Sequence, residues 1–168
     1  MPSVGELSGM DQAAFVSALE GIWEHSPWIA ARAWAARPFA DAAALHAAMV
    51  AVVAAATQAE QLALIRAHPE LAGRAAIRGE LTAESRSEQG GAGLDRCSPE
   101  EFAQLTALNA RYNARFGFPF VIAVRGHTRG SIIAAFKARL ENEAGVERRT
   151  CLDEIGKIGW LRLGDRVK

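Results

Sequence analysis

The sequence predicts an all-α fold, a single-domain bundle of about seven to nine helices that spans residues 1–168. Alanine, the strongest helix former, fills 35 of the 168 positions. Helix-capping residues and helix-ending glycines and prolines recur along the chain. Apolar residues make up 50% and charged residues 23% of the composition, which is typical of a globular protein with a buried core.

Three helices are expected in the first third of the chain. The apolar residues from Phe15 to Trp23 recur on one helical face. Ser26-Pro27 combines an N-cap with a first-position proline and opens a short helix through Trp34. Asp41 then caps an alanine-rich helix, which is better explained as a buried or amphipathic helix than as a membrane span.

The next helix has defined ends. Thr57 and Glu60 have the spacing of a capping box, and the helix must end at His68 because Pro69 follows. Residues 71–81 contain Gly73 and Gly79, and we expect them to form a loop or a broken turn.

Capping signals also bound the helices of the second half. Ser98-Pro99-Glu100-Glu101 opens a helix that Gly117 ends. Its inward-facing residues are Phe102, Leu105, Leu108, Tyr112 and Phe116. Thr128 or Ser131 opens a further helix, and a last one carries apolar residues from Leu152 to Leu161. Glycines at 156 and 159 fall inside this last helix, which is therefore expected to be weak or bent.

One apolar segment does not have the pattern of a helix. Residues 118–124 form a continuous apolar run between Gly117 and Gly126, and the run is short and rich in β-branched residues. We expect it to be buried extended chain that passes between helices.

Charge and cysteine content argue against several classes of protein. Basic and acidic side chains both number 19, so the formal net charge is zero, and no polybasic run offers a nucleic-acid surface. Residues 85–168 carry more basic than acidic groups, which mildly favours a small anionic ligand there. Two cysteines are too few for a disulfide framework, and no signal-peptide pattern opens the chain. We therefore expect reduced thiols, a cytoplasmic location and no membrane partner.

Four histidines are candidates for chemistry. His46, inside the alanine-rich helix, and His25, at a helix junction, are expected to be structural, whereas His127 is a loop residue and a candidate ligand contact. His68 differs because Pro69 holds the backbone extended and displays the ring at a helix C-terminus. The negative end of the helix dipole favours a protonated imidazolium there, which suits a general acid.

A polar cluster at residues 85–89 precedes several glycines. Ser85 and Glu88 have capping-box spacing, so a helix with a glycine-rich end explains the cluster without any catalytic role. The sequence lacks the lysine-containing phosphate loop, the zinc-hydrolase motif and the serine-hydrolase elbow. A histidine, a glutamate, small hydroxyls and an amide remain, and this set fits proton transfer on a polar heterocycle.

These same residues carry the signature of a known family. The motifs are Ala67-His68-Pro69-Glu70-Leu71-Ala72-Gly73, Leu81-Thr82-x-Glu84-Ser85-x-x-Glu88-Gln89-x-x-Ala92-Gly93-Leu94, and Tyr112-x-x-Arg115-Phe116-Gly117-Phe118-Pro119-Phe120-Val121-Ile122. In this order they closely resemble the OHCU decarboxylases, which act on 2-oxo-4-hydroxy-4-carboxy-5-ureidoimidazoline, the last intermediate between urate and (S)-allantoin. The resemblance runs from about Phe15 to Leu163.

The resemblance implies an all-helical enzyme that needs neither a cofactor nor a metal, acts on a small ureide and is commonly a homodimer. It implies that His68 is the catalytic histidine and that Glu88 is its partner, which either orients the imidazole or holds the substrate hydroxyl. The substrate site would be lined by Pro69, Ser85, Arg86, Ser87, Gln89, Phe120, Val121, Ile122, Ala123 and Val124. Because the substrate ring can delocalise the electrons left by CO₂, the protein must stabilise that charge and deliver one proton to one face.

Two points stay open. The family often has Lys or Arg at the position of His127, so the contact to the leaving carboxylate is not assigned among His127, Arg125 and Arg129. The alternative functions are a non-catalytic helical protein that binds a ureide in the same pocket, and a hydrolase of a neighbouring ureide. The residues expected for such a hydrolase are missing from the sequence.

Overall fold

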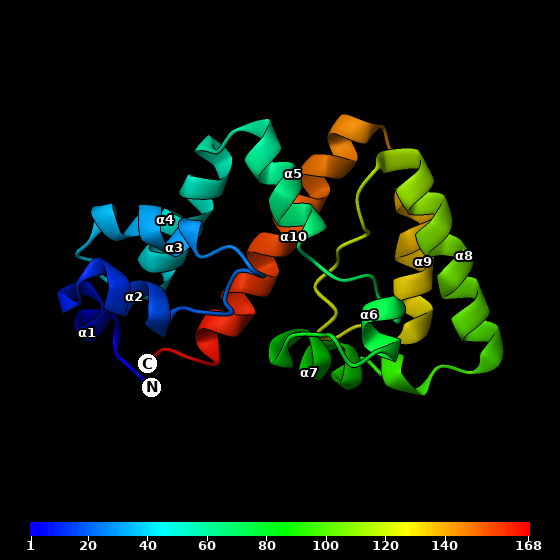
Figure 1. The fold of residues 1–168 in the computed structure, drawn as a ribbon, viewed down its shortest axis with the longest axis horizontal. Coiled ribbons are helices and arrows are strands. Elements are labelled where there is room, and N and C mark those ends of the chain that lie inside the picture. Colours follow the sequence, from blue (N-terminus) through cyan, green and yellow to red (C-terminus); the bar gives the residue numbers. More distant parts are fainter. The chain divides into compact units, whose positions relative to one another are not determined.

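The computed structural model describes the backbone of residues 1–168 and the side chains at every position except 74 and 75. The all-α class is confirmed, because the described backbone forms helices, turns and coil without a strand (Figure 1). Nine of its ten α-helices have six residues or more, in agreement with the predicted number. The elements are α1 (Val4–Gly9), α2 (Gln12–Ala18), α3 (Trp28–Ala33), η1 (Trp34–Ala36), α4 (Ala42–Ala55), α5 (Gln58–Arg66), α6 (Arg74–Ile77), α7 (Ala83–Gly91), η2 (Leu94–Arg96), α8 (Pro99–Phe116), α9 (Arg129–Arg139) and α10 (Ala144–Gly164).

The chain divides into two compact units. Unit 1 comprises Met1–Ala67 and Gly156–Lys168, and unit 2 comprises His68–Ile155. The last helix, α10, therefore supplies residues to both units. The single domain expected over residues 1–168 stays a prediction.

Unit 1 contains α1 to α5 and the C-terminal end of α10. Helix α3 packs against both α2 and α4. The largest fully buried side chains of unit 1 include Leu7, Phe15, Ile29, Leu45, Met49 and Leu64. The two chain ends meet in this unit (Figure 1), where the N–H of Lys168 donates to the carbonyl of Pro2 over 3.1 Å.

The first predicted helix is shorter than expected. Helix α2 ends at Ala18, so the prediction of a helix that includes Ile22 and Trp23 is wrong. Gly21 takes a left-handed φ of 85°, which few residues other than glycine adopt, and this glycine was the signal in the sequence. Ile22 and Trp23 are still buried, as their apolar character requires.

The two glycines of α10 do not end the helix, which is continuous from Ala144 to Gly164. A Cβ at Gly159 would lie only 3.3 Å from the ring of Trp23, so the absence of a side chain allows close packing there. The ring of His46 lies 2.8 Å from the carbonyl oxygen of Gly156 and stacks on Trp23. Both glycines therefore lie at packing contacts within unit 1.

Most predicted helix ends are confirmed. They are the N-caps Asp41 of α4, Thr57 of α5, Ser98 of α8 and Thr128 of α9, together with Gly117 at the end of α8. Two N-cap predictions are wrong. The hydroxyl of Ser26 donates to the carbonyl of Glu24 rather than capping α3. Thr82 caps α7 in place of Ser85, which lies inside the helix and is buried.

Unit 2 contains α6 to α9 and the N-terminal part of α10, with α8 and α9 packed together (Figure 1). The buried ring of Tyr112 is surrounded by Phe116, Phe118, Phe120 and Phe136. The expected extended segment is confirmed, because residues 118–124 are buried and form neither helix nor strand. Within the predicted loop 71–81 lies the one-turn helix α6. The inward orientation expected of Phe102 is wrong, since it is 38% exposed.

Among the described residues, no single helix is both long and apolar enough to cross a membrane. The bent pair of α4 and α5 passes that test only when the two are taken together, and only on length and composition.

Candidate active site

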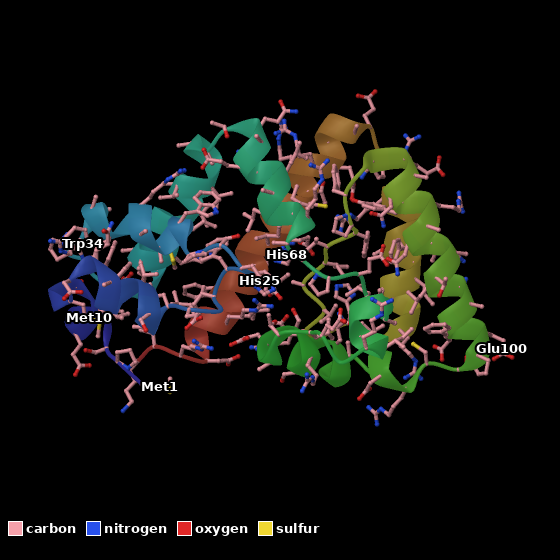
Figure 2. All side chains as sticks on the ribbon, in the orientation of Figure 1. Met1, Met10, His25, Trp34, His68 and Glu100 are labelled. Atoms are coloured by element: carbon pink, nitrogen blue, oxygen red, sulfur yellow. The ribbon has the colours of Figure 1, made fainter. Side chains whose placement is uncertain are left out.

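The candidate catalytic histidine lies directly after α5. The helix ends at Arg66, Ala67 closes it, and His68 follows as a buried residue with 7% of its surface exposed. Pro69 disfavours helical backbone at the preceding residue, so the chain turns away from the helix at this point. Figure 2 shows His68 where the chain leaves α5 and runs toward α6. The ring is therefore held in a fixed, mostly dry place at the start of unit 2.

The loop after His68 is held by amide side chains of α7 and α8. Gln89 donates to the carbonyl of Glu70 over 3.3 Å and accepts the N–H of Ala72 over 3.0 Å. Asn109 donates to the carbonyl of Leu71 over 3.0 Å. These bonds hold Ala72 at a φ of 51°, a left-handed conformation that costs a residue with a Cβ about 1 kcal/mol or more. Side chains of α7 and α8 therefore fix the conformation of this loop.

The side chain of Glu70 is also tied down. Asn113, one turn after Asn109 on α8, donates to its carboxylate over 2.7 Å. Asn109 and Asn113 were missed by the sequence reasoning. Asn109 lies between Leu108 and Tyr112 on the buried face of α8, and a polar residue on an apolar helical face was the available signal.

Helix α7 sorts the predicted polar cluster by face. Ser85, Glu88 and Gln89 share one face by their helical spacing; Ser85 and Gln89 are buried, and Glu88 is half-buried. Arg86 and Ser87 are exposed, and Arg86 donates to the carbonyl of Gly79 over 3.3 Å. The structure therefore brings Glu88 next to the residue that clamps the His68 loop, while Ser87 points to solvent.

The apolar part of the predicted site is the buried segment 120–124. Arg139 donates to the carbonyl of Val121 over 2.7 Å, and the N–H of Ala123 donates to Glu154 over 3.3 Å. Pro69, the remaining predicted lining residue, is half-buried beside His68 in the chain. Every residue of the predicted set thus belongs to unit 2.

A buried polar cluster lies behind this segment. Glu147, which is fully buried, accepts the hydroxyl of Tyr112 over 2.5 Å and the Nε of Arg139 over 2.6 Å. Burial raises the pKa of Tyr112 far above its ordinary range, so the phenol keeps its proton and acts as a donor. Burial also raises the pKa of Cys151, although hydrogen bonds from Tyr112 and the Val121 backbone and the charge of Arg139 act against it.

The three groups considered for the leaving carboxylate differ in their surroundings. Arg129 donates through Nε to Glu101 over 2.8 Å and through a terminal nitrogen to the carbonyl of Gly93 over 3.0 Å. The Nδ1 of His127 lies 2.9 Å from the Ser131 hydroxyl. Arg125 is exposed. Arg129 and His127 are thus committed to neighbouring protein groups.

Two cavities lie in unit 2 beneath the clamped loop. The first encloses about 610 Å³ and is lined by Arg86, Gln89, Leu94 and Cys97, among others. The second encloses about 530 Å³ and is lined by Glu70, Asn109 and Thr106, among others, and both include Ala72, Ile77 and Phe102. Neither lining includes His68 or Glu88. The two cavities therefore border the clamped loop without including the predicted catalytic pair in their linings.

The described side chains contain no group of three or more His, Cys, Asp or Glu residues that could hold a metal ion. Both cysteines are free thiols, and burial raises the pKa of Cys97 above its ordinary value.

Comparison with known proteins gives consistent matches. A family model described as OHCU decarboxylase matches residues 8–164. A putative 2-oxo-4-hydroxy-4-carboxy-5-ureidoimidazoline decarboxylase of Homo sapiens is 42% identical over 165 residues, which cover 98% of this chain and 95% of that protein. The decarboxylase of the same name from Haloferax volcanii is 41% identical over 161 residues, covering 96% of this chain and 94% of the relative.

Two solved structures share the fold. The crystal structure of an (S)-allantoin synthase superposes with a TM-score of 0.76 at 28% identity and covers 98% of this chain. This chain spans only 54% of that longer protein. The crystal structure of an OHCU decarboxylase in the presence of (S)-allantoin gives a TM-score of 0.70 at 23% identity, covering 86% of this chain and 93% of the other. At that identity the second likeness concerns the fold alone.

Proposed function

We propose that His68 and Glu88 carry out the reaction of this chain, which belongs to the OHCU decarboxylase family and is a decarboxylase of urate degradation. The substrate is 2-oxo-4-hydroxy-4-carboxy-5-ureidoimidazoline and the products are CO₂ and (S)-allantoin. The observation that carries the proposal is the Gln89 clamp. By bonding both Glu70 and Ala72, Gln89 joins the helix that bears Glu88 to the loop that begins at His68.

The reaction needs little from the protein beyond placement and one proton. The bond to the carboxyl carbon breaks, CO₂ leaves, and the electron pair passes into the imidazoline ring of the substrate. His68 then delivers a proton to one face of the ring, a step in which a positioned acid contributes about 100- to 10,000-fold. Glu88 either orients the imidazole or holds the substrate hydroxyl. We propose that no cofactor takes part, since the substrate itself holds the electrons.

The surroundings of His68 support this division of work. Its 7% exposure limits competing proton delivery from water. The buried segment 120–124 offers apolar walls, and a dry wall disfavours the charged carboxylate relative to neutral CO₂. Ser85, buried on the Glu88 face of α7, offers a hydroxyl to the polar groups of the ring.

The finer parts of the assignment are proposals as well. We propose a cytoplasmic enzyme, which the two free thiols support, and a homodimer, as the family resemblance implies. Size-exclusion chromatography with light scattering tests the second point, because a dimer has twice the mass of 18.0 kDa.

Circular dichroism of the product tests the function. Urate is oxidised and hydrolysed in situ with the wild-type protein present or absent, and the allantoin signal is followed in time. Rapid appearance of one enantiomer supports decarboxylation with protonation on one face. A slow, racemic product at the uncatalysed rate, from a folded protein, contradicts it and favours a ureide-binding protein.

The role of Glu88 has a matched control on the same helix. Glu88→Ala is expected to remove turnover while the melting temperature changes little, whereas Glu84→Ala, in the first turn of α7, keeps turnover. If Glu88→Ala lowers activity only as far as it lowers the folded fraction, Glu88 is a structural residue and not part of the reaction.

A further inference from the structure

The segment 120–124 has no helix or strand to hold it in place, so its position depends on side chains around it. We infer that Arg139, held in turn by Glu147 and Tyr112, is the positioning residue that fixes this segment against the substrate. The inference rests on the proposed function, because only there does the segment act as a wall of the substrate site. Arg139 itself does not touch the substrate in this account and acts through the segment.

A single guanidinium contacts the two consecutive residues Phe120 and Val121 and is itself bound by Glu147. Arg139 donates through Nε to Glu147 over 2.6 Å and through a terminal nitrogen to the carbonyl of Val121 over 2.7 Å. Its central carbon also lies 4.2 Å from the centre of the Phe120 ring. Only the planar fork of arginine can donate in two directions and stack on a ring at once, which a lysine ammonium cannot do.

The orientation of the guanidinium is itself fixed. Glu147 is fully buried and also accepts the Tyr112 hydroxyl over 2.5 Å and the Asn142 amide over 3.0 Å. A second terminal nitrogen of Arg139 lies 3.3 Å from the sulfur of Cys151. With the carboxylate held by donors from several directions, the fork has little freedom to turn, and the Val121 carbonyl is held with it.

Aromatic packing fixes the same point of the chain. The Phe120 ring stacks on Phe136 with centres 3.8 Å apart and meets the Tyr112 ring edge-on at 5.4 Å. Tyr112 therefore acts twice, through its ring on Phe120 and through its hydroxyl on Glu147. The residues that follow, Ile122 to Val124, start from an anchored position.

Arg37 of unit 1 supplies a matched control outside the predicted site. It makes the same kind of contacts, because a terminal nitrogen donates to the carbonyl of Trp34 over 3.1 Å and the central carbon lies 3.5 Å from the centre of the Trp34 ring. Arg37→Lys therefore breaks equivalent contacts without releasing residues 120–124.

The experiment compares KM and kcat of Arg139→Lys and Arg37→Lys in the in situ assay, at several concentrations of the generated substrate. We expect Arg139→Lys to raise KM about tenfold or more, since a shift of about 1 Å in a substrate-positioning group can cost about 100-fold. Arg37→Lys is expected to keep the wild-type KM. A variant that is merely less stable lowers apparent kcat with its folded fraction and leaves KM unchanged, so that result for Arg139→Lys overturns the inference.

Tyr112→Phe keeps the ring packing and removes only the hydroxyl, and it decides the question if Arg139→Lys does not fold. The lost bond to Glu147 is expected to raise KM about three- to tenfold. If Tyr112→Phe has the same KM as the wild-type protein, the inference about Arg139 is overturned. The proposed function is not, because it depends on turnover by the wild-type protein. A wild-type protein without turnover overturns the proposed function and this inference together, so the two failures are distinguishable.

Discussion

Part of the irregular backbone of unit 1 is held by side chains from the far end of the chain, whereas residues 70–72 and Val121 of unit 2 are held by side chains much nearer in the sequence. In unit 1, Arg162 donates to the carbonyl of Gly21 from 141 residues away, and Arg166 donates to Glu20 from 146 residues away. In unit 2, the donors and acceptors that hold residues 70–72 and Val121 lie 17 to 43 residues away. The closure of unit 1 therefore involves arginines near the C-terminus, while these segments of unit 2 have anchors nearer in the sequence.

The two units also differ in the surroundings of a histidine, which is half-buried in unit 1 and buried in unit 2. In unit 1, His46 lies among Trp23, Trp160 and the carbonyl of Gly156, so packing occupies its ring. In unit 2, His68 lies at a helix exit next to a clamped loop. The difference teaches that the polar anchors of unit 1 serve closure and those of unit 2 serve placement. Four predictions test this division.

The largest expected effect belongs to the two histidines. His68→Asn is expected to remove turnover by about 100- to 10,000-fold, because the proton donor is lost, while stability stays close to wild type. His46→Asn is expected to lower the melting temperature and to keep turnover per folded molecule. Product formation and thermal unfolding are measured on both. Turnover by a folded His68→Asn variant contradicts the assignment of the proton donor.

The second prediction concerns the buried ion pair of unit 1. Arg162 and Glu24 are 4% and 2% exposed and lie 2.8 Å apart, so Arg162→Met leaves a buried carboxylate without its cation. The expected loss in free energy of unfolding is about 3–5 kcal/mol. Arg32→Met breaks the exposed pair with Glu60 and is expected to change the stability far less, because water screens that pair.

Fluorescence can assign that loss to one unit. All four tryptophans, at 23, 28, 34 and 160, lie in unit 1, and the single tyrosine, Tyr112, lies in unit 2. Denaturant unfolding followed by tryptophan emission thus reports unit 1 directly. An equal shift of the tryptophan transition in Arg162→Met and Arg32→Met contradicts the idea that the buried pair closes unit 1.

The third prediction concerns the clamp of unit 2. Gln89→Leu removes two hydrogen bonds to the His68 loop and is expected to cost about 1–3 kcal/mol of stability together with a large part of the turnover. Gln61→Leu is the control in unit 1, where that amide donates to the carbonyl of Val53 over 2.9 Å. It is expected to lower stability and leave turnover per folded molecule unchanged. A fall of turnover in both variants denies that placement is special to unit 2.

The same contrast explains which features the sequence could predict. Helix ends that depend on residues three positions apart, such as the Ser98 capping box, and the glycine stop at Gly117 were correct because the interactions are local. The extended segment 118–124 was also correct, since glycines bound it and its composition does not suit a helix. The residues predicted for the site all fall in unit 2, where anchors are near in sequence.

The failures have physical reasons as well. Both Thr82 and Ser85 can cap α7, and only the burial of Ser85 and Gln89 favours the earlier start. The role of Gln89 as a clamp was not predicted, because its amide bonds two backbone groups that lie 17 and 19 residues away, which no local pattern reveals. The Arg139 bridge to Val121 is hidden in the same way, because charge on α9 gives no sign of the carbonyl it meets.

The smallest expected effect comes from two glycines of α10 that lie three residues apart. A Cβ at Gly156 would meet only a methyl group of Val50 at 3.9 Å, an ordinary contact. Gly156→Ala is therefore expected to stabilise unit 1 by about 0.5–1 kcal/mol through helix propensity. A Cβ at Gly159 would lie 3.3 Å from the buried Trp23 ring, which His46 and Met49 hold in place. Gly159→Ala gains the same propensity, but overpacking of about 1–3 kcal/mol offsets it.

Tryptophan emission during denaturant unfolding measures both variants, because Trp23 itself lies at the contact. The midpoint is expected to rise for Gly156→Ala and to fall or stay unchanged for Gly159→Ala. Equal gains would mean that Trp23 can move aside without cost, and that the C-terminal end of α10 is held in unit 1 by its arginines rather than by close packing. If the unfolding midpoint rises for Gly156→Ala alone, close packing on the Trp23 ring stabilises unit 1 together with the Arg162–Glu24 ion pair. In unit 2, residues 68–72 and 118–124 are held instead by hydrogen bonds from side chains.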